Sequence, residues 1–301
     1  MSKAIIYSLF GYNKPKHPNC FTFDSYLAGL MLSIRINRLV FPGWVNVLET
    51  DKSTYAAYGE FFMALEANGS LRIERNADGA KLCEAMLWRM KPSFWTDQYG
   101  KWEFSHVLCR DLDSLHTYRE AQAVQMWIDH DKAMHAITDS ISHDVALLGG
   151  MIGIRPDHFT SKVNIRSWGE LMARCTIDLS NKGSDQTFLN SVIYPLVAQK
   201  GNDSITQHYF KGHGKTWLAD YHTCSCWKED HFYGHNKGCS LDITINGVSE
   251  DMKETNEISW HMGMSGWNQP QTLALIEKHK DKFADLYEIE KRHKDIFYWV
   301  K

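Results

Sequence analysis

Short apolar runs alternate along the chain with longer segments in which apolar residues recur every three or four positions. The short runs are typical of buried strands, and the longer segments are typical of helices with one buried face. The expected elements of the first part of the chain are strands at residues 4–9, 44–48 and 71–74 and helices at residues 26–41, 55–65 and 81–90. Strands that are separated by helices usually pair in parallel. The pattern predicts an α/β fold with a mainly parallel sheet and helices on both of its faces.

The next apolar run, at residues 104–109, continues directly into a pair of carboxylates. Asp111 and Asp113 follow this run, and in an extended segment residues two apart point to the same side. Both side chains can then face one ligand from the end of a strand. Two neighbouring carboxylates are unfavourable unless a cation lies between them or water solvates them. The pattern therefore indicates either a divalent-metal site or a solvated turn.

A predicted helix and a glycine-containing strand follow the carboxylate pair. Thr117 and Glu120 have the spacing of a capping box, and the apolar residues of segment 121–128 recur at helical spacing. Residues 146–154 form a further apolar run, which the pair Gly149-Gly150 interrupts. Glycine allows the backbone to approach a ligand closely. We expect a second strand here that a ligand can approach at the two glycines.

Two charged residues elsewhere have both a structural and a functional interpretation. Arg89 ends the predicted helix at residues 81–90, so its charge either stays at the surface above a buried stem or binds a phosphate. Asp185 follows Ser184, which has the residue type of a helix N-cap, and the helix dipole would favour the carboxylate. A capped helix start would also hold Asp185 rigidly beside a ligand. We therefore treat both residues as candidates for binding or catalysis.

Composition limits the classes of function. The 301 residues and their apolar fraction of 44% allow one large α/β domain, or a domain with an appendage. A net charge of −3 gives no overall attraction to nucleic acid or to anionic membranes. No apolar run is long enough to cross a bilayer, and residues 1–10 lack the length and the cleavage site of a secretory signal. With seven cysteines and no such signal, we expect reduced thiols and a cytoplasmic protein, in the host cytoplasm if its origin is viral.

The composition changes in residues 207–238, which are rich in His, Lys, Trp and Tyr. Soft metal ligands occur here in the order Cys-x-Cys, His-x-x-x-His, Cys. This spacing matches no standard zinc finger, but the residue types can hold a structural Zn²⁺. The five candidate ligands are Cys224, Cys226, His231, His235 and Cys239. The alternative is that these are reduced cysteines and surface histidines. The basic and aromatic residues of this segment, Lys211, His213, Lys215, Trp217 and Trp227, can equally line an acceptor groove.

The chain has three predicted parts. Residues 1–200 form the core, residues 201–250 an irregular appendage, and residues 251–301 a C-terminal segment that completes the candidate site and contains an amphipathic helix. Pro270 begins a terminal amphipathic helix. Its expected buried residues are Leu275, Phe283, Leu286 and Ile289. The basic residues of this helix form either a solvated face or a contact for a polyanion.

Taken together, these motifs resemble nucleotide-sugar-dependent glycosyltransferases of the GT-A type. An Asp-x-Asp at a strand end, followed by an apolar Gly-Gly run, is typical of that group. More narrowly, Arg110-Asp-Leu-Asp-Ser114 and Leu148-Gly-Gly-Met-Ile-Gly153 resemble bacterial and phage transferases associated with surface polysaccharide, as does Tyr7-Ser-Leu-Phe-Gly11. Asp185-Gln186 resembles the Asp-Gln motif of the glycogenin-like retaining family. An ordered set of motifs is much more specific than a lone Asp-x-Asp.

The resemblance implies a role for each motif. The implied donor-binding residues are Ser8, Leu9, Phe10, Gly11, Arg89, Arg110, Asp111, Gly149 and Gly150. Asp185 and Gln186 are the implied catalytic residues beside the reacting sugar. Asp111, Asp113 and His261 are the implied ligands of Mn²⁺ or Mg²⁺. His208 is the alternative candidate for the histidine ligand. The Lys-Pro-Trp that follows this histidine in the family is absent from this chain.

The function implied by the resemblance is metal-dependent transfer of a sugar from a nucleotide-diphosphate donor, with a UDP-sugar favoured, to an acceptor hydroxyl. The Asp-Gln motif implies that the anomeric configuration is retained. The implied acceptor is a saccharide or hydroxymethylated phage DNA. Two alternatives remain open. One is a phosphotransferase of the haloacid dehalogenase type with Asp111 as nucleophile, and the other is a zinc-containing nucleic-acid-binding protein built on residues 207–239.

Overall fold

The computed structural model of the chain describes residues 1–12, 23–138, 145–198, 204–209, 223–224, 242–245, 248–251 and 270–297. Its main element is an eight-stranded sheet with the strand order β3-β2-β1-β4-β6-β5-β7-β8. These strands are β1 (Ser2–Leu9), β2 (Val45–Asp51), β3 (Arg72–Asn76), β4 (Phe104–Arg110), β5 (Met134–Thr138), β6 (Met151–Ile154), β7 (Ile205–Tyr209) and β8 (Thr223–Cys224). A separate antiparallel pair consists of β9 (Asp242–Ile245) and β10 (Val248–Asp251).

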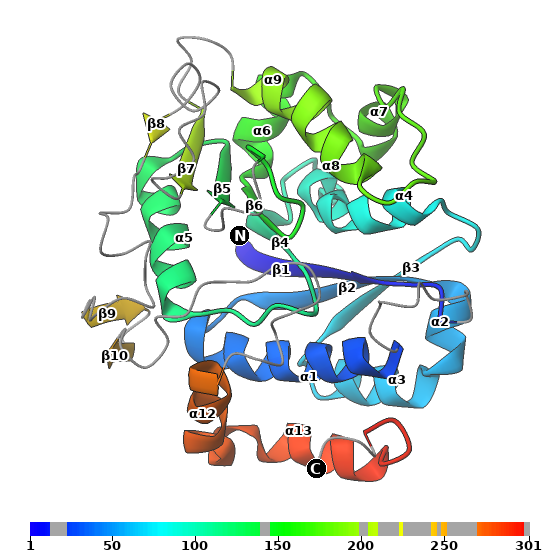
Figure 1. Ribbon diagram of the computed structural model, residues 1–301, viewed down its shortest axis with the longest axis vertical. Coiled ribbons are helices and arrows are strands. Elements are labelled where there is room, and N and C mark those ends of the chain that lie inside the picture. Colours follow the sequence, from blue (N-terminus) through cyan, green and yellow to red (C-terminus); the bar gives the residue numbers. More distant parts are fainter. Residues whose placement is uncertain are drawn as a thin grey trace. The chain divides into compact units, whose positions relative to one another are not determined.

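The sheet is mixed but mainly parallel. The pairs β1–β4, β2–β3, β5–β7 and β7–β8 are parallel, whereas β6 runs antiparallel to both β4 and β5. The helices are α1 (Phe23–Val40), α2 (Lys52–Ala57), α3 (Gly59–Ala67), α4 (Leu82–Leu87), α5 (Tyr118–His130), α6 (Pro156–Val163), α7 (Trp168–Ala173), α8 (Ser184–Phe188), α9 (Tyr194–Val197), α12 (Pro270–Lys278) and α13 (Ala284–Arg292) (Figure 1). The predicted α/β class with a mainly parallel sheet, flanking helices and a C-terminal helix is confirmed.

The chain forms two compact units, which we describe separately. The first unit comprises Met1–Ile6, Ala80–Arg110 and Gln122–Cys239, and the second comprises Tyr7–Gly79, Asp111–Ala121 and Ser240–Lys301. The strand β7 pairs in parallel with β5. Residues 205–209, which the predicted boundary at residue 200 placed in an irregular appendage, are therefore part of the sheet.

In the first unit, helices pack on both faces of the strands. Phe159 of α6 and Phe188 of α8 are buried in one apolar cluster with Ile152 and Ile154 of β6. On β6, Gly153 alternates with these two residues, and a Cβ built on it would lie 2.7 Å from Trp127 of α5. The lack of a side chain at this position allows the indole to lie directly on the strand, and its Nε1 donates a hydrogen bond to the Lys132 carbonyl at 2.9 Å.

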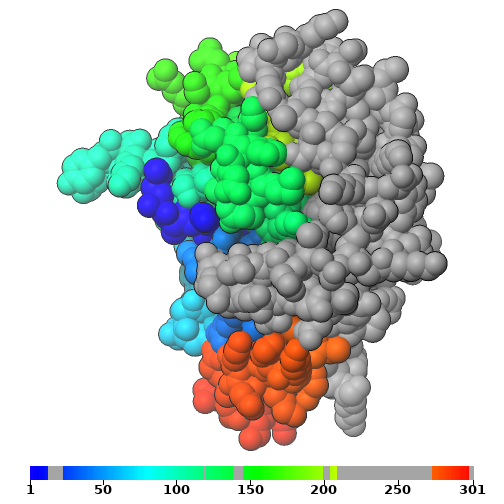
Figure 2. Space-filling model, turned by 90° about the vertical axis from the view of Figure 1, so that its left-hand side faces the viewer, coloured from blue at the N-terminus to red at the C-terminus, as the bar shows by residue number. Residues whose placement is uncertain are grey.

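In the second unit, the C-terminal helices pack beside α1 and α3 (Figure 1). Leu286 and Ile289 of α13 are buried. A salt bridge of 2.5 Å joins Arg35 of α1 to Glu290, and the Arg35 side chain is only 4% exposed. These helices form a continuous surface in orange in Figure 2. Their lysines are exposed, and two of them pair with acidic neighbours, Lys280 with Glu277 and Lys291 with Glu288.

Several predicted elements have different limits in the structure. The helix expected at residues 55–65 is two helices, α2 and α3, that meet at Tyr58. The helix expected at 81–90 ends at Leu87 and continues as a 3₁₀ helix, Trp88–Phe94. The single terminal helix is three segments, because a 3₁₀ turn, Lys280–Phe283, separates α12 from α13. The apolar run 146–154 is a strand only from Met151 onward, so the two glycines lie in a loop before β6.

Candidate functional site

Asp111 and Asp113 lie in a turn that follows β4 directly. Val107, Leu108 and Cys109 of this strand are fully buried. Leu112, between the two carboxylates, is 4% exposed, whereas Asp111 and Asp113 are half-buried. The predicted extended geometry is wrong, because Leu112 and Asp113 form a turn. The turn still separates buried from accessible side chains. The apolar Leu112 is buried, and the carboxylates on either side of it stay partly accessible.

A buried polar network supports this turn from within the second unit. His116 is 1% exposed, and its Nδ1 contacts the side-chain oxygen of Asn37 in α1. The Asn37 amide also donates hydrogen bonds to the Tyr7 hydroxyl at 2.8 Å and to Asn46 at 2.7 Å. Nε2 of His116 lies 3.8 Å from the Glu120 carboxylate. The network fixes the segment after the Asp-x-Asp pair, and sequence reasoning missed it because its members are far apart in the chain.

The predicted capping box is present in part. The Thr117 hydroxyl accepts a hydrogen bond from the Glu120 amide at 3.1 Å, as expected at the start of α5. The Glu120 side chain is buried and faces His116. Glu120 therefore belongs both to the helix start and to the polar network.

Ser8, Leu9, Phe10 and Gly11 lie at the carboxyl end of β1, where open α/β sheets commonly bind ligands. The Gly11 amide donates a hydrogen bond to Oδ2 of Asp51 at 3.0 Å, and Gly11 has a φ of 69°. Oδ1 of Asp51 accepts from the Thr54 amide at 2.9 Å, so Asp51 is also the N-cap of α2. Asp51, which the sequence did not single out, connects the ends of two strands and the start of a helix.

Two arginines lie inside the first unit. Arg89 is 4% exposed, and its Nη1 donates a hydrogen bond to the Arg110 carbonyl at 3.3 Å. The interpretation of Arg89 as a surface residue is therefore wrong. Arg110 is 1% exposed, and its Nη1 donates to the carbonyls of Cys109 and Ile152, both at 2.8 Å. Arg110 thus holds β4 and β6 together at the ends of these strands.

The Asp-Gln motif lies at the start of α8, in the first unit. The N-cap is Gly183 with a φ of 87°, and it makes no side-chain cap. The prediction of Ser184 as the cap is wrong, because Ser184 is the first helical residue and its hydroxyl donates to the Asn181 carbonyl at 2.5 Å. Asp185 is 1% exposed, and its Oδ2 has no hydrogen-bond partner among the residues that the structure describes.

Gln186 contacts the backbone of the loop that contains the two glycines. Its Nε2 donates to the Leu147 carbonyl at 2.9 Å, and its Oε1 accepts from the Gly149 amide at 2.9 Å. A Cβ on Gly149 would lie 3.1 Å from both Nη2 of Arg89 and the side-chain amide of Gln186. The structure therefore brings together Arg89, Gly149 and Gln186, three of the residues that the sequence selected.

His208 of β7 lies in the interior of the first unit. His208 and His135 are fully buried, and their ring centroids are 5.3 Å apart. His135 stacks on Trp127 at 5.5 Å. Burial lowers the pKa of His135 well below its ordinary value, and the neighbouring His208 and Arg110 lower it further. These contacts give His208 a place in the core next to a second imidazole.

Several predicted metal ligands lie outside the described part of the chain. This holds for His261, Cys226, His231, His235 and Cys239, and for the side chain of Cys224 in β8. Within the described ranges, no group of three or more His, Cys, Asp or Glu side chains is arranged to hold a metal ion. Asp111 and Asp113 provide two hard oxygen donors, which is the donor type that Mg²⁺ and Mn²⁺ prefer.

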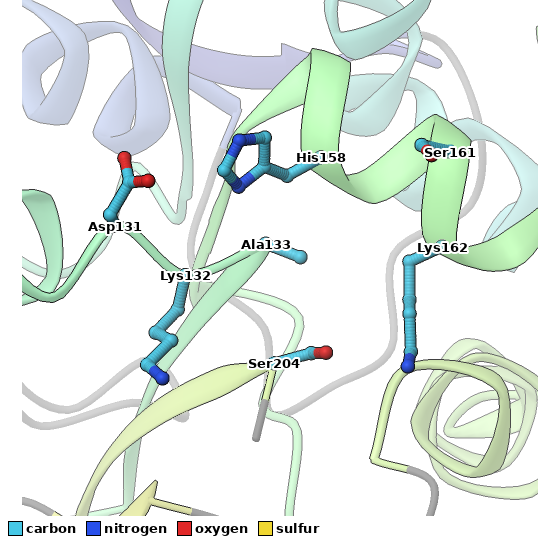
Figure 3. A pocket seen from close by; sticks show the side chains of 7 residues that line it. All are labelled: Asp131, Lys132, Ala133, His158, Ser161, Lys162 and Ser204. Carbon is cyan, nitrogen blue, oxygen red and sulfur yellow. The ribbon is translucent and has the colours of Figure 1, made fainter. Parts of the chain in front are cut away.

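A surface pocket of about 290 Å³ lies elsewhere in the first unit (Figure 3). It is lined by Asp131, Lys132, Ala133, His158, Ser161, Lys162 and Ser204. Asp131 is also ion-paired with Arg155. None of the candidate site residues from the sequence lines this pocket.

The fold described above is that of an α/β protein with a mixed, mainly parallel sheet. No protein-family model matches the chain, and no curated protein matches it. Among solved structures, the chain is similar to that of 4-diphosphocytidyl-2C-methyl-D-erythritol synthase from Anaerococcus prevotii, with 9% identity over 68% of this chain and 86% of that one, at a TM-score of 0.39. A similarity this low says nothing about activity. None of the helices in the described ranges is sufficiently long and apolar to cross a membrane.

Proposed function

We propose that the chain is a glycosyltransferase that moves a sugar from a nucleotide-diphosphate donor to an acceptor hydroxyl. The observation that carries the proposal is the burial of Asp185, whose Oδ2 has no partner among the described residues. A buried carboxylate oxygen without a hydrogen-bond donor is costly, so its presence here favours a ligand that supplies one. A sugar hydroxyl is such a donor. Arg89, whose guanidinium lies near the same loop as Gln186, suits the oxygens of a diphosphate.

Asp111 and Asp113 are the proposed ligands of Mn²⁺ or Mg²⁺, with His261 as the third. Two half-buried carboxylates directly after a buried strand match the donor chemistry of such a cation. A cation held by these residues would supply Lewis-acid stabilisation of the leaving diphosphate. The contribution of the chain is to hold both carboxylates in place through the buried Leu112 and the His116 network.

The residues have separate proposed roles. Asp185 accepts a hydrogen bond from the donor sugar and orients it, and Arg89 stabilises the charge on the diphosphate. Residues 8–11 at the end of β1 contact the nucleoside, with the Gly11 amide held by Asp51. Retention of the anomeric configuration is part of the proposal through the Asp185-Gln186 motif.

A saccharide is the acceptor that the charges favour. A DNA-binding surface needs lysines and arginines that are available to phosphates. The net charge of −3 gives no overall attraction to a polyanion, and on the C-terminal helices Lys280 and Lys291 have acidic neighbours, Glu277 and Glu288. We therefore propose a saccharide acceptor ahead of hydroxymethylated DNA, a cytoplasmic location, and a UDP-sugar as the first donor to test.

The test is nucleotide release from a panel of UDP-, GDP-, CDP- and TDP-sugars, with and without Mn²⁺. We expect one class of donor to be hydrolysed slowly without acceptor, and only when the cation is present. Asp113→Asn should abolish this hydrolysis while the protein stays folded. Donor binding of equal affinity with and without Mn²⁺ would contradict the metal-dependent mechanism. A phosphate trapped on Asp111 would instead favour the phosphotransferase, and stoichiometric zinc without nucleotide binding would favour the nucleic-acid-binding protein.

A further inference from the structure

We propose that the side-chain amides of Gln186, Asn190 and Gln207 form a clamp on residues 145–150, and that this clamp positions the loop backbone against Arg89 for donor binding. We call these three residues the amide clamp. The inference rests on the proposed function, since the donor is taken to be the ligand of Arg89. It changes the role of Gln186 from a catalytic residue to a positioning residue.

The amide clamp binds the loop backbone at Ala146, Leu147 and Gly149. Gln207 donates from Nε2 to the Ala146 carbonyl at 2.9 Å. Asn190 accepts from the Leu147 amide at 2.9 Å and donates to the Leu147 carbonyl at 2.9 Å. Gln186 donates to the same carbonyl and accepts from the Gly149 amide, both at 2.9 Å. Backbone groups in a loop have no strand or helix partners, so these side chains replace the missing hydrogen bonds.

The helix that carries Gln186 and Asn190 has an irregular segment that contains one of these two residues. Between α8 and α9 the helix has a π-helical segment, Leu189–Ile193, and Asn190 lies in it. Nδ2 of Asn190 also donates to the Gln186 carbonyl at 2.8 Å, which links the two clamp residues. Widened helical turns of this kind are rare and are often found at functional sites. Gln207 comes from β7, a different element, so the loop is held from two directions.

The loop in turn determines what lies beside Arg89. Gly149 is buried, and a Cβ added to it would lie 3.1 Å from Nη2 of Arg89. This backbone is therefore in close contact with the guanidinium, and a shift of the loop moves the surface on which the guanidinium lies. Both ends of the Gln186 amide bind the loop backbone. We infer that Gln186 acts on the donor through Gly149 and Arg89 and not by direct contact.

The first experiment measures amide hydrogen exchange of Leu147 and Gly149 in the protein without ligand. The variants are Asn190→Ala, Gln207→Leu and the isosteric Gln186→Glu, which keeps an acceptor for the Gly149 amide but loses the donor to Leu147. The control is Gln125→Ala, because Gln125 lies on the exposed face of α5 and its amide donates to Asp129. We expect exchange at Leu147 to be about tenfold faster or more in the clamp variants and unchanged in the control.

The second experiment measures nucleotide release from the donor by the same variants. We expect kcat to fall about tenfold in Asn190→Ala, with KM for the donor changed less than about threefold, because misplacing a binding loop affects the transition state more than the ground state. Faster exchange with an unchanged kcat would reduce the clamp to a purely structural role, and unchanged exchange would disprove the clamp itself. If the wild-type protein releases nucleotide from no donor, the proposed function fails, and with it the assignment of the donor to Arg89. The exchange measurement would still decide whether the three amides hold the loop.

Discussion

A Cβ built on Gly29 would lie 2.0 Å from the carbonyl oxygen of Leu112. Gly29 is a residue of α1, and Leu112 is the buried residue between Asp111 and Asp113. The helix backbone therefore supports the Asp-x-Asp turn directly, with no side chain between them. The position of the two carboxylates depends on a glycine from a distant part of the sequence.

Gly29→Ala should displace the turn, because a methyl group cannot occupy the same space as a backbone carbonyl. We expect unfolding free energy to fall by about 1–3 kcal/mol, the usual cost of overpacking a core. Divalent-cation affinity should fall as well, measured by calorimetry with Mn²⁺. Gly59→Ala is the matched control, because a Cβ on Gly59 would meet nothing within 4 Å. Equal melting temperatures for the two variants would show that the turn moves to make room for the methyl group without loss of stability.

The sequence predicted the strands better than the loops. Residues 107–109 and 4–7 are continuous apolar runs, and a strand buried on both faces leaves little choice of structure. Residues 146–150 are equally apolar but form a loop, because Gln186, Asn190 and Gln207 satisfy its backbone with side-chain amides. No local pattern reveals such contacts, since Gln207 and Ala146 are 61 positions apart.

In the candidate site, too, the sequence predicted some residues but not the long-range contacts that position them. Residue types and spacing were sufficient to select Arg89, Gly149 and Gln186, which the structure brings together. The contacts that position these residues were not predictable. Gly29 is an ordinary glycine of a helix by its sequence, and the importance of His116 depends on Asn37 and Tyr7 from other elements. These roles depend on long-range packing, which cannot be predicted from the local pattern of a single sequence.

Glu290→Ala should loosen the C-terminal helices from α1. The variant leaves Arg35 without its salt-bridge partner, and the Arg35 side chain is 4% exposed, so the lost partner is not replaced by water. Removing one member of a buried ion pair typically costs about 3–5 kcal/mol. Chemical denaturation measures the loss. Glu277→Ala is the control, because its partner Lys280 is exposed and such a pair contributes about 0–1 kcal/mol. Similar losses in the two variants would mean that the Arg35 pair adds nothing.

Stability should fall as the pH decreases below about 6.5, the ordinary pKa of histidine. Burial lowers the pKa of His135 well below this value and that of His106 to about 4. In this range the unfolded chain binds protons that the folded protein does not, so acid favours unfolding. Each such histidine contributes a slope of up to about 1.4 kcal/mol per pH unit.

His135→Phe keeps a ring against Trp127 and removes the titrating group. We expect the free energy of unfolding of this variant to depend less on pH between about 6.5 and 5 than that of the wild-type protein. Denaturation in urea at several pH values is the measurement. His158→Phe, at a partly exposed position, controls for the substitution itself. An identical pH dependence in wild type and His135→Phe would show that His135 is not a source of acid sensitivity.

Asp185→Asn should separate stability from activity. The wild-type side chain is 1% exposed, and its Oδ2 lacks a partner among the described residues, so the folded protein carries the cost of a buried polar atom without a hydrogen bond. The amide replaces the carboxyl group with little change in volume. We expect the variant to unfold at the same or a higher temperature in the absence of ligand, and to lose release of nucleotide from the donor. Residues that serve binding are often retained at the expense of stability. Asp185→Asn with full activity would place the reacting sugar elsewhere. A strongly destabilised variant would show instead that the carboxylate has a structural role.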